Sequence, residues 1–275
     1  MIEFTDCKIN IGLDVVRRRP DGYHDIATCM YHIPWGDVVE IIPSSDSETT
    51  LTLLGNKVDC PAEKNLVMKA YRALESEYSL PAMNIILQKI VPDGAGLGGG
   101  SSDASHTLRL LNKMCNLGIT DIRLAEIAKN LGADCPFFVY DSPMIAEGIG
   151  EKLTPINLDL SGYTIAIVKP ESVNISTKQA YAGITPTHPA TPLHQLLKLP
   201  IEQWQGRVKN DFEASIFPLA PQIAELKQAL LEAGAIYASM SGSGASVYGI
   251  FSNDKMAERA VNRFTTYQKF VYNVP

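Results

Sequence analysis

The stretch Pro92–Ser105 reads PDGAGLGGGSSDAS and holds five glycines in the seven residues from Gly94 to Gly100. Glycine loses more backbone entropy on folding than other residues, about 0.5–1 kcal/mol relative to alanine within regular structure. So many glycines therefore predict that something must approach the main chain closely here. The apolar residues that follow have the spacing of an amphipathic helix that would begin at Ser101–Asp103, and they are Ala104, Leu108, Leu111 and Met114.

The segments around the glycines predict an α+β chain. Ala82–Val91 reads as a strand leading into them, and Asp121–Leu131 as a second helix after the first one ends at Asn116–Gly118. Further strands are expected at Asp37–Pro43, Tyr163–Val168 and Ala245–Phe251, further helices at Asn65–Leu74 and Pro221–Ala233, a turn at Arg19–Gly22 and an irregular connection in the proline-rich segment Gly183–Pro200. A change of composition near residues 155–160 predicts two domains, 1–158 and 159–275.

Composition narrows the function classes. The chain has 275 residues, of which 45% are hydrophobic and 20% charged, as in ordinary globular domains. Its net charge of −6 argues against neutralising nucleic-acid phosphates as the main role. No run of 18 apolar residues or signal-like N-terminus occurs, and the five scattered cysteines fit reduced thiols. We therefore expect a cytoplasmic protein with no nucleic-acid or membrane partner. We also expect a monomer or weak homodimer, which the composition itself does not decide.

A glycine-rich turn that opens a helix can bind phosphate, because free N–H groups and the helix dipole face outward there. A Walker A loop requires Gly-Lys-Ser or Gly-Lys-Thr, and neither occurs in the chain. Gly94, Gly96 and Gly99 fit the dinucleotide pattern G-x-G-x-x-G, but that fold continues with a parallel strand where this chain predicts a helix. A purely structural glycine turn is the remaining alternative.

The stretch also resembles the phosphate loop of the GHMP kinases, the superfamily of galactokinase, homoserine kinase, mevalonate kinase and phosphomevalonate kinase. Its longer form LGGGSSDA is typical of the branch that phosphorylates 4-diphosphocytidyl-2-C-methyl-D-erythritol. Other segments resemble motifs of that branch in the same order, and they are Lys8–Asn10 (KIN), Arg19–His24 (RPDGYH), Gly132–Phe138 (GADCPFF), Ile175–Thr177 followed by Tyr181, and Ser239–Ala245 (SMSGSGA).

The resemblance implies a two-domain GHMP kinase fold of class α+β. An N-terminal ribosomal-protein-S5-like domain would carry the phosphate loop, and a C-terminal ferredoxin-like domain would lie across a cleft. The implied reaction is ATP-dependent phosphorylation of the 2-hydroxyl of cytidine diphospho-methylerythritol, in the non-mevalonate route to isoprenoid precursors. Asp134 would be the general base and Lys8 its electrostatic partner, because a carboxylate can accept the hydroxyl proton and an ammonium can stabilise the developing charge.

The same resemblance implies the ligand contacts. For the ATP phosphates these are Pro92, Gly94, Gly96, Leu97, Gly98, Gly99, Gly100, Ser101 and Ser102; for the adenine, where no motif guides the choice, they are Val58, Asn65 and Leu66. For the substrate they are Asn10, Tyr23, His24, Thr177, Tyr181, Gly242 and Ser243. Aromatic rings suit the cytidine base because stacking contributes about 1–3 kcal/mol per base. Mg²⁺ is expected with ATP; no metal motif is present, and Ser102 is the one candidate ligand.

Two other functions stay open at this point. One is another GHMP kinase, of the mevalonate or homoserine type, or the related diphosphomevalonate decarboxylase. The other is a catalytically silent relative that binds ATP and a sugar as a sensor. The segment Arg19–His24 favours a cytidine substrate over a small polyol, and the presence of both Lys8 and Asp134 favours an enzyme. The basic run Arg17–Arg19 reads as a solvated loop or as a contact to an anionic substrate.

Overall fold

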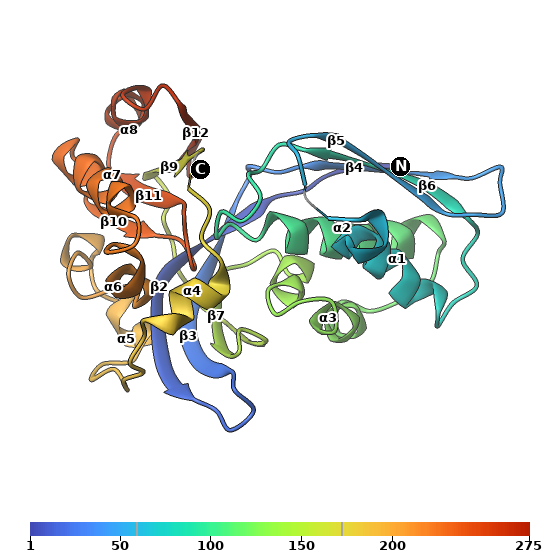
Figure 1. The fold of residues 1–275 in the computed structure, drawn as a ribbon, viewed down its shortest axis with the longest axis horizontal. Coiled ribbons are helices and arrows are strands. Elements are labelled where there is room, and N and C mark those ends of the chain that lie inside the picture. Colours follow the sequence, from blue (N-terminus) through green and yellow to red (C-terminus); the bar gives the residue numbers. More distant parts are fainter. Residues whose placement is uncertain (59, 172) are drawn as a thin grey trace. The chain divides into compact units, whose positions relative to one another are not determined.

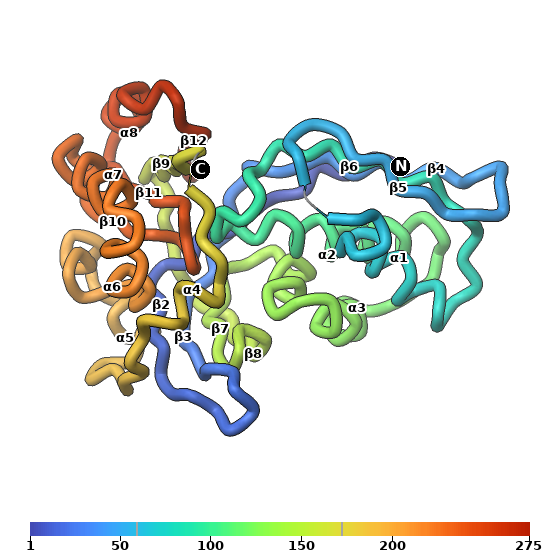
Figure 2. The backbone as a smooth tube through the Cα atoms, in the orientation of Figure 1, coloured from blue at the N-terminus to red at the C-terminus, as the bar shows by residue number. Residues whose placement is uncertain are grey.

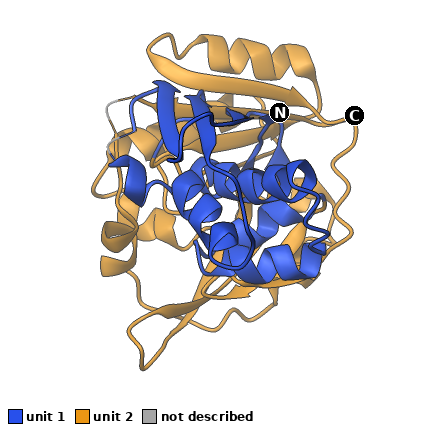
Figure 3. Ribbon diagram, turned by 90° about the vertical axis from the view of Figure 1, so that its right-hand side faces the viewer, with its two compact units in different colours: residues 1–8, 32–93, 98–141 blue, residues 9–31, 94–97, 142–275 orange. Residues whose placement is uncertain are grey.

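The computed structural model describes residues 1–58, 60–171 and 173–275, and Figures 1 and 2 trace its elements. The chain forms two compact units that alternate along the sequence (Figure 3). Unit 1 consists of residues 1–8, 32–93 and 98–141, and unit 2 of residues 9–31, 94–97 and 142–275. The chain thus passes between units at Lys8–Ile9 and, within the glycine stretch, at Leu97–Gly98. The single boundary near residue 158 stays a prediction.

Unit 1 is a four-stranded sheet with helices over one face (Figure 1). The order is β1 (Ile2–Phe4), β4 (Val38–Pro43), β6 (Met83–Lys89) and β5 (Thr50–Gly55), with β5 parallel to β6 and the other neighbours antiparallel. Strand β6 alternates buried with half-buried residues, so its buried side chains point to one face. They pack against helices α1 (Leu66–Glu75), α2 (Gly99–Met114) and α3 (Asp121–Lys129). The short helices η1 (Ala62–Lys64) and η2 (Cys135–Val139) complete the unit.

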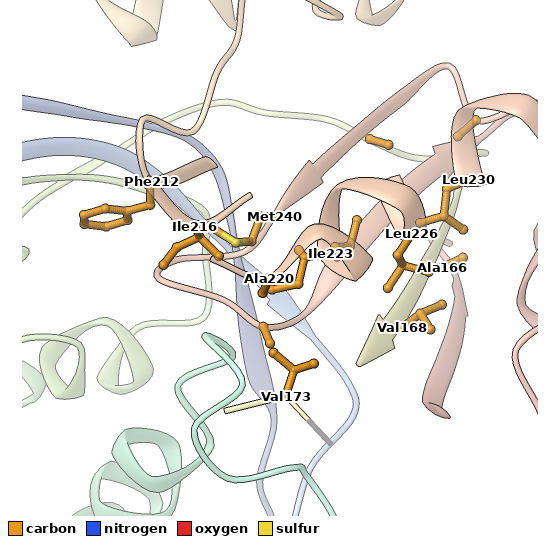
Figure 4. Packing of buried hydrophobic residues seen from close by; sticks show 14 of the residues in the cluster. Ala166, Val168, Val173, Phe212, Ile216, Ala220, Ile223, Leu226, Leu230 and Met240 are labelled. Atoms are coloured by element: carbon orange, nitrogen blue, oxygen red, sulfur yellow. The ribbon is translucent and has the colours of Figure 1, made fainter. Parts of the chain in front are cut away.

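Unit 2 contains an antiparallel sheet in the order β10 (Tyr237–Met240), β11 (Val247–Phe251), β9 (Thr164–Pro170), β12 (Tyr267–Asn273). With α7 (Pro221–Glu232) before β10 and α8 (Asp254–Asn262) before β12, its framework is strand–helix–strand–strand–helix–strand. This is the ferredoxin-like arrangement expected from the resemblance. Figure 4 shows the core, where Ile223, Leu226 and Leu230 of α7 belong to one buried cluster with Ala166 and Val168 of β9.

A second sheet, which lies mostly in unit 2, has the order β2 (Cys7–Arg18), β3 (His24–Ile33), β7 (Met144–Gly148), β8 (Lys152–Pro155). The turn predicted between its first two strands is present. The Gly22 amide donates to the Arg19 carbonyl at 3.1 Å, and the Arg19 amide donates to the Tyr23 carbonyl at 2.8 Å. The remaining helices of unit 2 are α4 (Thr177–Ala182), α5 (Leu193–Leu196), η3 (Ile201–Gln203) and α6 (Phe212–Ile216).

The expected α+β architecture is confirmed, and each predicted strand and helix is present within a few residues of its predicted bounds. The start of α2 differs in an informative way. The helix begins at Gly99, two residues before Ser101, because Gly98 takes the left-handed conformation at φ 71° and occupies the N-cap position. Gly99 and Gly100 therefore belong to the helix itself. Within the part of the chain that the structure describes, no helix is long and apolar enough to cross a membrane.

Candidate active site

Gly98 joins the glycine stretch to α2 in unit 1. A Cβ added to Gly98 would lie 3.1 Å from Cε of Lys8 and 3.1 Å from the Phe138 ring, and the positive φ would strain any other residue. The Ser102 amide donates to the Gly98 carbonyl at 2.9 Å, the first hydrogen bond of the helix. The amides of the residues before it therefore precede the helical ladder, as at any helix N-terminus. The glycine requirement at position 98 arises from the left-handed backbone together with the close approach of Lys8 and Phe138.

Lys8 and Asp134 form an ion pair within unit 1. The Lys8 Nζ lies 3.4 Å from Asp134 Oδ2, and the lysine side chain is 4% exposed whereas the aspartate side chain is 32% exposed. Asp134 occupies the N-cap position of η2, where Pro136 starts a new turn. A buried ammonium beside an accessible carboxylate is an arrangement that can accept a proton and stabilise nearby negative charge.

A second acidic side chain, Asp6, lies between α2 and the strand that carries Lys8. Its Oδ1 accepts a hydrogen bond from the Ser102 hydroxyl at 2.7 Å and lies 3.2 Å from Nε2 of His106. Its Oδ2 is paired with Nδ1 of His32, whose ring stacks on Phe137 at 4.0 Å. Burial alone would raise the pKa of Asp6, but the hydrogen bonds from His106 and His32 hold it well below its usual range.

Sequence reasoning missed this cluster of Asp6, His32 and His106. The two histidines match no metal spacing and read as ordinary surface or helix positions, and no motif includes Asp6. Only the tertiary fold brings residues that are 26 and 100 positions apart to one carboxylate.

The described side chains offer few ligands for Mg²⁺. Ser102 is fully buried and its hydroxyl already serves Asp6, so this geometry gives no support to Ser102 as a magnesium ligand. Across residues 1–58, 60–171 and 173–275, no group of three or more His, Cys, Asp or Glu side chains could hold a metal ion. Mg²⁺ is commonly held largely by water and substrate phosphates rather than by a protein cage. The residues present therefore do not form a dedicated magnesium site.

The other half of the glycine stretch packs inside unit 2. A Cβ on Gly96, whose φ is +74°, would lie 2.1 Å from the Ser241 carbonyl oxygen. The Ser241 hydroxyl donates to the Gly96 carbonyl at 2.9 Å, and a Cβ on Gly242 would lie 3.0 Å from Asn10 Oδ1. The structure thus brings together three predicted residues from three separate motifs, namely Asn10, Gly96 and Gly242. Ser243 lies half-buried in the same turn.

Two of the aromatic residues predicted to recognise the substrate meet in unit 2. His24 and Tyr181 stack with ring centroids 4.6 Å apart and an interplanar angle of 16°. Tyr181 also packs edge-on against Phe212 at 4.8 Å. Its helix, α4, starts at Thr177. Tyr23 is 62% exposed at the end of the β2–β3 hairpin. His24 and Tyr181 therefore form an aromatic pair, which Tyr23 does not join.

The residues suggested for adenine lie in unit 1. The side-chain oxygen of Asn65 accepts from the Val67 amide at 2.9 Å and so caps α1. A Cβ on Gly100 would lie 3.9 Å from Leu66, which places Leu66 near the first turn of α2. Val58 is half-buried. The structure gives Asn65 a structural role, and an adenine contact from these three residues stays a prediction.

The basic run Arg17–Arg19 has acidic partners on its own hairpin. Arg17 pairs with Asp25, and Arg19 pairs with Asp21 at 2.7 Å and with Asp25 at 3.4 Å. These exposed ion pairs agree with the interpretation of a solvated loop.

Two family models match the chain: the GHMP kinases N terminal domain over residues 65–142 and the GHMP kinases C terminal domain over residues 193–269. A protein of Parabacteroides distasonis named 4-diphosphocytidyl-2-C-methyl-D-erythritol kinase is 49% identical over 251 residues, which is 91% of this chain and 92% of the relative. A protein of Bacteroides fragilis with the same name is 46% identical over 257 residues, 93% of each chain.

Solved structures give the same picture. A crystal structure of 4-(cytidine 5'-diphospho)-2C-methyl-D-erythritol kinase matches with a TM-score of 0.82 and 29% identity, covering 98% of each chain. A mevalonate kinase structure matches with a TM-score of 0.70 at 14% identity, again covering 98% of each chain, which shows a shared fold.

Proposed function

The chain belongs to the GHMP kinase family, and from this premise we propose that it transfers the γ-phosphoryl group of ATP to the 2-hydroxyl of 4-diphosphocytidyl-2-C-methyl-D-erythritol. The strongest structural support for this proposal is the position of Lys8. In unit 1, Lys8 pairs with Asp134 and also packs against Gly98, where α2 begins. An acid, a cation and a helix N-terminus thus lie together, and these are the groups that phosphoryl transfer requires.

We infer that the triphosphate lies against the N-terminal amides of α2, contributed by Gly99, Gly100 and Ser101. Asp134 would accept the proton of the substrate hydroxyl as the hydroxyl oxygen bonds to the γ-phosphorus. The bond between the γ-phosphorus and the bridging oxygen of the β-phosphate breaks at the same time, and ADP is released. Lys8 would stabilise the negative charge on the attacking oxygen and keep the Asp134 carboxylate oriented. Since the side chains of the residues that the structure describes form no metal cage, we infer that any Mg²⁺ arrives with the nucleotide phosphates.

Substrate recognition falls to unit 2 in this proposal. The stacked pair of His24 and Tyr181 offers an aromatic face and a ring nitrogen to a cytosine base, and Tyr23 is exposed next to His24. Asn10, Thr177, Gly242 and Ser243 are proposed to contact the rest of the substrate. The small, non-aromatic acceptors of mevalonate-type or homoserine-type kinases would leave this aromatic pair without a ligand, so we favour the cytidine substrate.

A sensor without turnover is the second candidate, and the intact Lys8–Asp134 pair argues against it. We further infer a cytoplasmic enzyme, a monomer or weak homodimer, that uses neither nucleic acid nor membrane as a partner. The net charge of −6 supports the absence of a nucleic-acid partner.

The deciding experiment is a coupled assay of ADP release with three acceptors: the cytidine diphospho-polyol, mevalonate and homoserine. We expect ADP release with the first acceptor alone. Release with mevalonate or homoserine in its place would reassign the substrate, and binding of ATP without release from any acceptor would favour the sensor.

A further inference from the structure

A buried cluster of charges lies beneath the start of α2, and nothing in the proposed reaction uses it. Lys89, at the end of β6, donates from Nζ to Oδ2 of Asp103 at 2.7 Å and also pairs with Oδ2 of Asp37. The side chains of all three are nearly inaccessible, at 5% exposure for Lys89, 0% for Asp37 and 2% for Asp103. We refer to these three residues as the Lys89 cluster.

Hydrogen bonds from the main chain hold the Lys89 cluster in place. Oδ1 of Asp37 accepts from the amides of Ile90 and Val91, at 2.5 Å and 2.8 Å. The Thr5 hydroxyl lies 3.3 Å from Oδ1 of Asp103. A Cβ on Gly99 would lie 3.6 Å from Asp37 Oδ2, so the cluster is directly behind the first residue of α2. Any anion held by the amides of that turn would therefore lie close to the cluster.

The charges in the cluster do not balance when every group is ionised. Two carboxylates and one ammonium sum to −1, and a proton on one carboxyl would bring the sum to zero. The pKa of Asp103 is raised to about 7, because burial and the negative charge of Asp37 raise it by more than the attraction of Lys89 lowers it. The neutralising proton is therefore placed on Asp103.

Cys7 of β2, Lys8 and Asp6 are further ionisable groups near the cluster, and Asp6 is paired with His32 and His106. Burial and the charge of Asp6 raise the pKa of the Cys7 thiol well above the ordinary value, and Asp37 and Lys89 also act on it. The thiol is therefore neutral throughout the neutral pH range. Asp103 is the member of the Lys89 cluster whose pKa lies near 7.

We propose that Asp103 takes up a proton when ATP binds, so that the Lys89 cluster becomes neutral beneath the bound triphosphate. The proposal rests on the proposed function, because that function places the triphosphate at the N-terminal turn of α2. A triphosphate brings several negative charges to the side of the turn opposite the cluster. Its field disfavours the net −1 state, so binding and protonation favour each other.

The affinity for ATP should fall as the pH rises. Binding shifts the pKa of Asp103 further upward, so ATP affinity is highest where Asp103 is protonated in the free protein. The affinity for ATP then falls as the pH rises from the pKa of Asp103 in the free protein towards its higher pKa in the complex. An upward shift of about one unit corresponds to about a tenfold loss of affinity across that range, and to about half a proton taken up per ATP at pH 7.5.

Isothermal titration calorimetry tests the proposed proton uptake. The β,γ-imido analogue of ATP is titrated into the protein at pH 7.5 in buffers of different ionisation enthalpy. The slope of observed enthalpy against buffer enthalpy gives the number of protons taken up. Wild type should take up about half a proton more than Asp103→Asn, whose amide stays neutral. Because the nucleotide titrates identically in both experiments, the difference belongs to the protein. The matched control Asp121→Asn, at the exposed start of α3, should behave as wild type.

The outcomes separate this inference from the proposed function. Tight binding with the same proton uptake in wild type and in Asp103→Asn would overturn the inference and leave the proposed kinase intact. Failure of the wild type to bind the analogue would overturn both, because the nucleotide would not be where the kinase needs it. Should Asp103→Asn fail to give a cooperative thermal transition, Asp103→Ser supplies the same comparison.

Discussion

The two units hold their functional side chains by different physical means. In unit 1, buried charges do so: Lys89 joins Asp37 and Asp103 behind α2, and Asp6 joins Ser102 to two histidines. In unit 2, the aromatic pair of His24 and Tyr181 rests on an apolar core through Phe212. Phosphoryl transfer needs fixed charges in a dry environment, whereas recognition of a base needs flat apolar surface. The contrast predicts that variants of unit 1 mainly change kcat and the proton uptake on binding ATP. Variants of unit 2 should mainly change the affinity for the substrate.

The largest effect should come from Asp134→Asn. The amide keeps the shape of the side chain but cannot accept the proton of the hydroxyl, so we expect kcat to fall by about 10³-fold, within the range for loss of a general base. Binding of the β,γ-imido analogue of ATP should change little, and single-turnover kinetics would locate the loss in the chemical step. Asp141→Asn is the control, because this exposed carboxylate of the same unit pairs with Arg109 on the surface. A loss of less than tenfold in Asp134→Asn would remove the aspartate from the role of base.

Lys89→Met should give the next largest effect, on stability. Removing the ammonium leaves two buried carboxylates without their cation, and breaking a buried ion pair from one side costs about 3–5 kcal/mol. Each unit has one tryptophan, Trp35 in unit 1 and Trp204 in unit 2, so urea unfolding of single-tryptophan variants reports the units separately.

In urea unfolding, Lys89→Met should lower the midpoint of the transition that Trp35 reports. The control is Ile223→Ala, which removes a fully buried side chain from the core of unit 2. It should lower the free energy of unfolding by about 2–5 kcal/mol and so lower the urea midpoint at Trp204. An unchanged midpoint at Trp35 in Lys89→Met would show that the buried charges of unit 1 contribute nothing net to its stability.

Tyr181→Ala should have a smaller effect and the opposite kinetic signature. Loss of one stacking partner for a base costs about 1–3 kcal/mol, so KM for the cytidine substrate should rise by about 5-fold to 160-fold while kcat stays close to wild type. Tyr181→Phe is the matched control, since it keeps the ring that packs on His24 and Phe212. A fall in kcat at saturating substrate, with KM unchanged, would contradict the division of labour between the units.

The parts of this structure that sequence predicts are those encoded locally. The spacing of apolar residues in α2 and the turn at Arg19–Gly22 depend on neighbours along the chain, and both are present as predicted. The resemblance of the segments Lys8–Asn10 and Gly132–Phe138 to family motifs supplied Lys8 and Asp134, which the structure joins at 3.4 Å. Those motifs carried no information about which side chains support the site.

The supporting residues could not be predicted because each depends on contacts between distant segments. Asp6 and His106 are 100 positions apart, and Lys89 and Asp37 are 52 positions apart. Asp103 belongs to the glycine stretch, yet its sequence neighbours do not show that it is buried against Lys89. Ser102 illustrates the converse: its position in the motif suggested a metal ligand, whereas the fold turns its hydroxyl to Asp6.

The smallest predicted effect tests whether a helix cap in unit 2 reaches the substrate through Tyr181. Ser176 caps α4: its hydroxyl accepts from the Gln179 amide at 3.2 Å, and its own amide donates to the Gln179 side chain at 3.0 Å. Ser176→Ala should cost about 1 kcal/mol of helix stability, and KM for the cytidine substrate should rise by up to about fivefold with kcat unchanged. Ser176→Asp should restore KM, since aspartate also caps helices. Thr120→Ala removes a cap of the same kind from α3 in unit 1, where the Arg123 amide donates to Thr120 at 3.3 Å, and it should leave KM unchanged. An equal rise in KM in Thr120→Ala would mean that general loss of stability, rather than the position of Tyr181, controls substrate affinity.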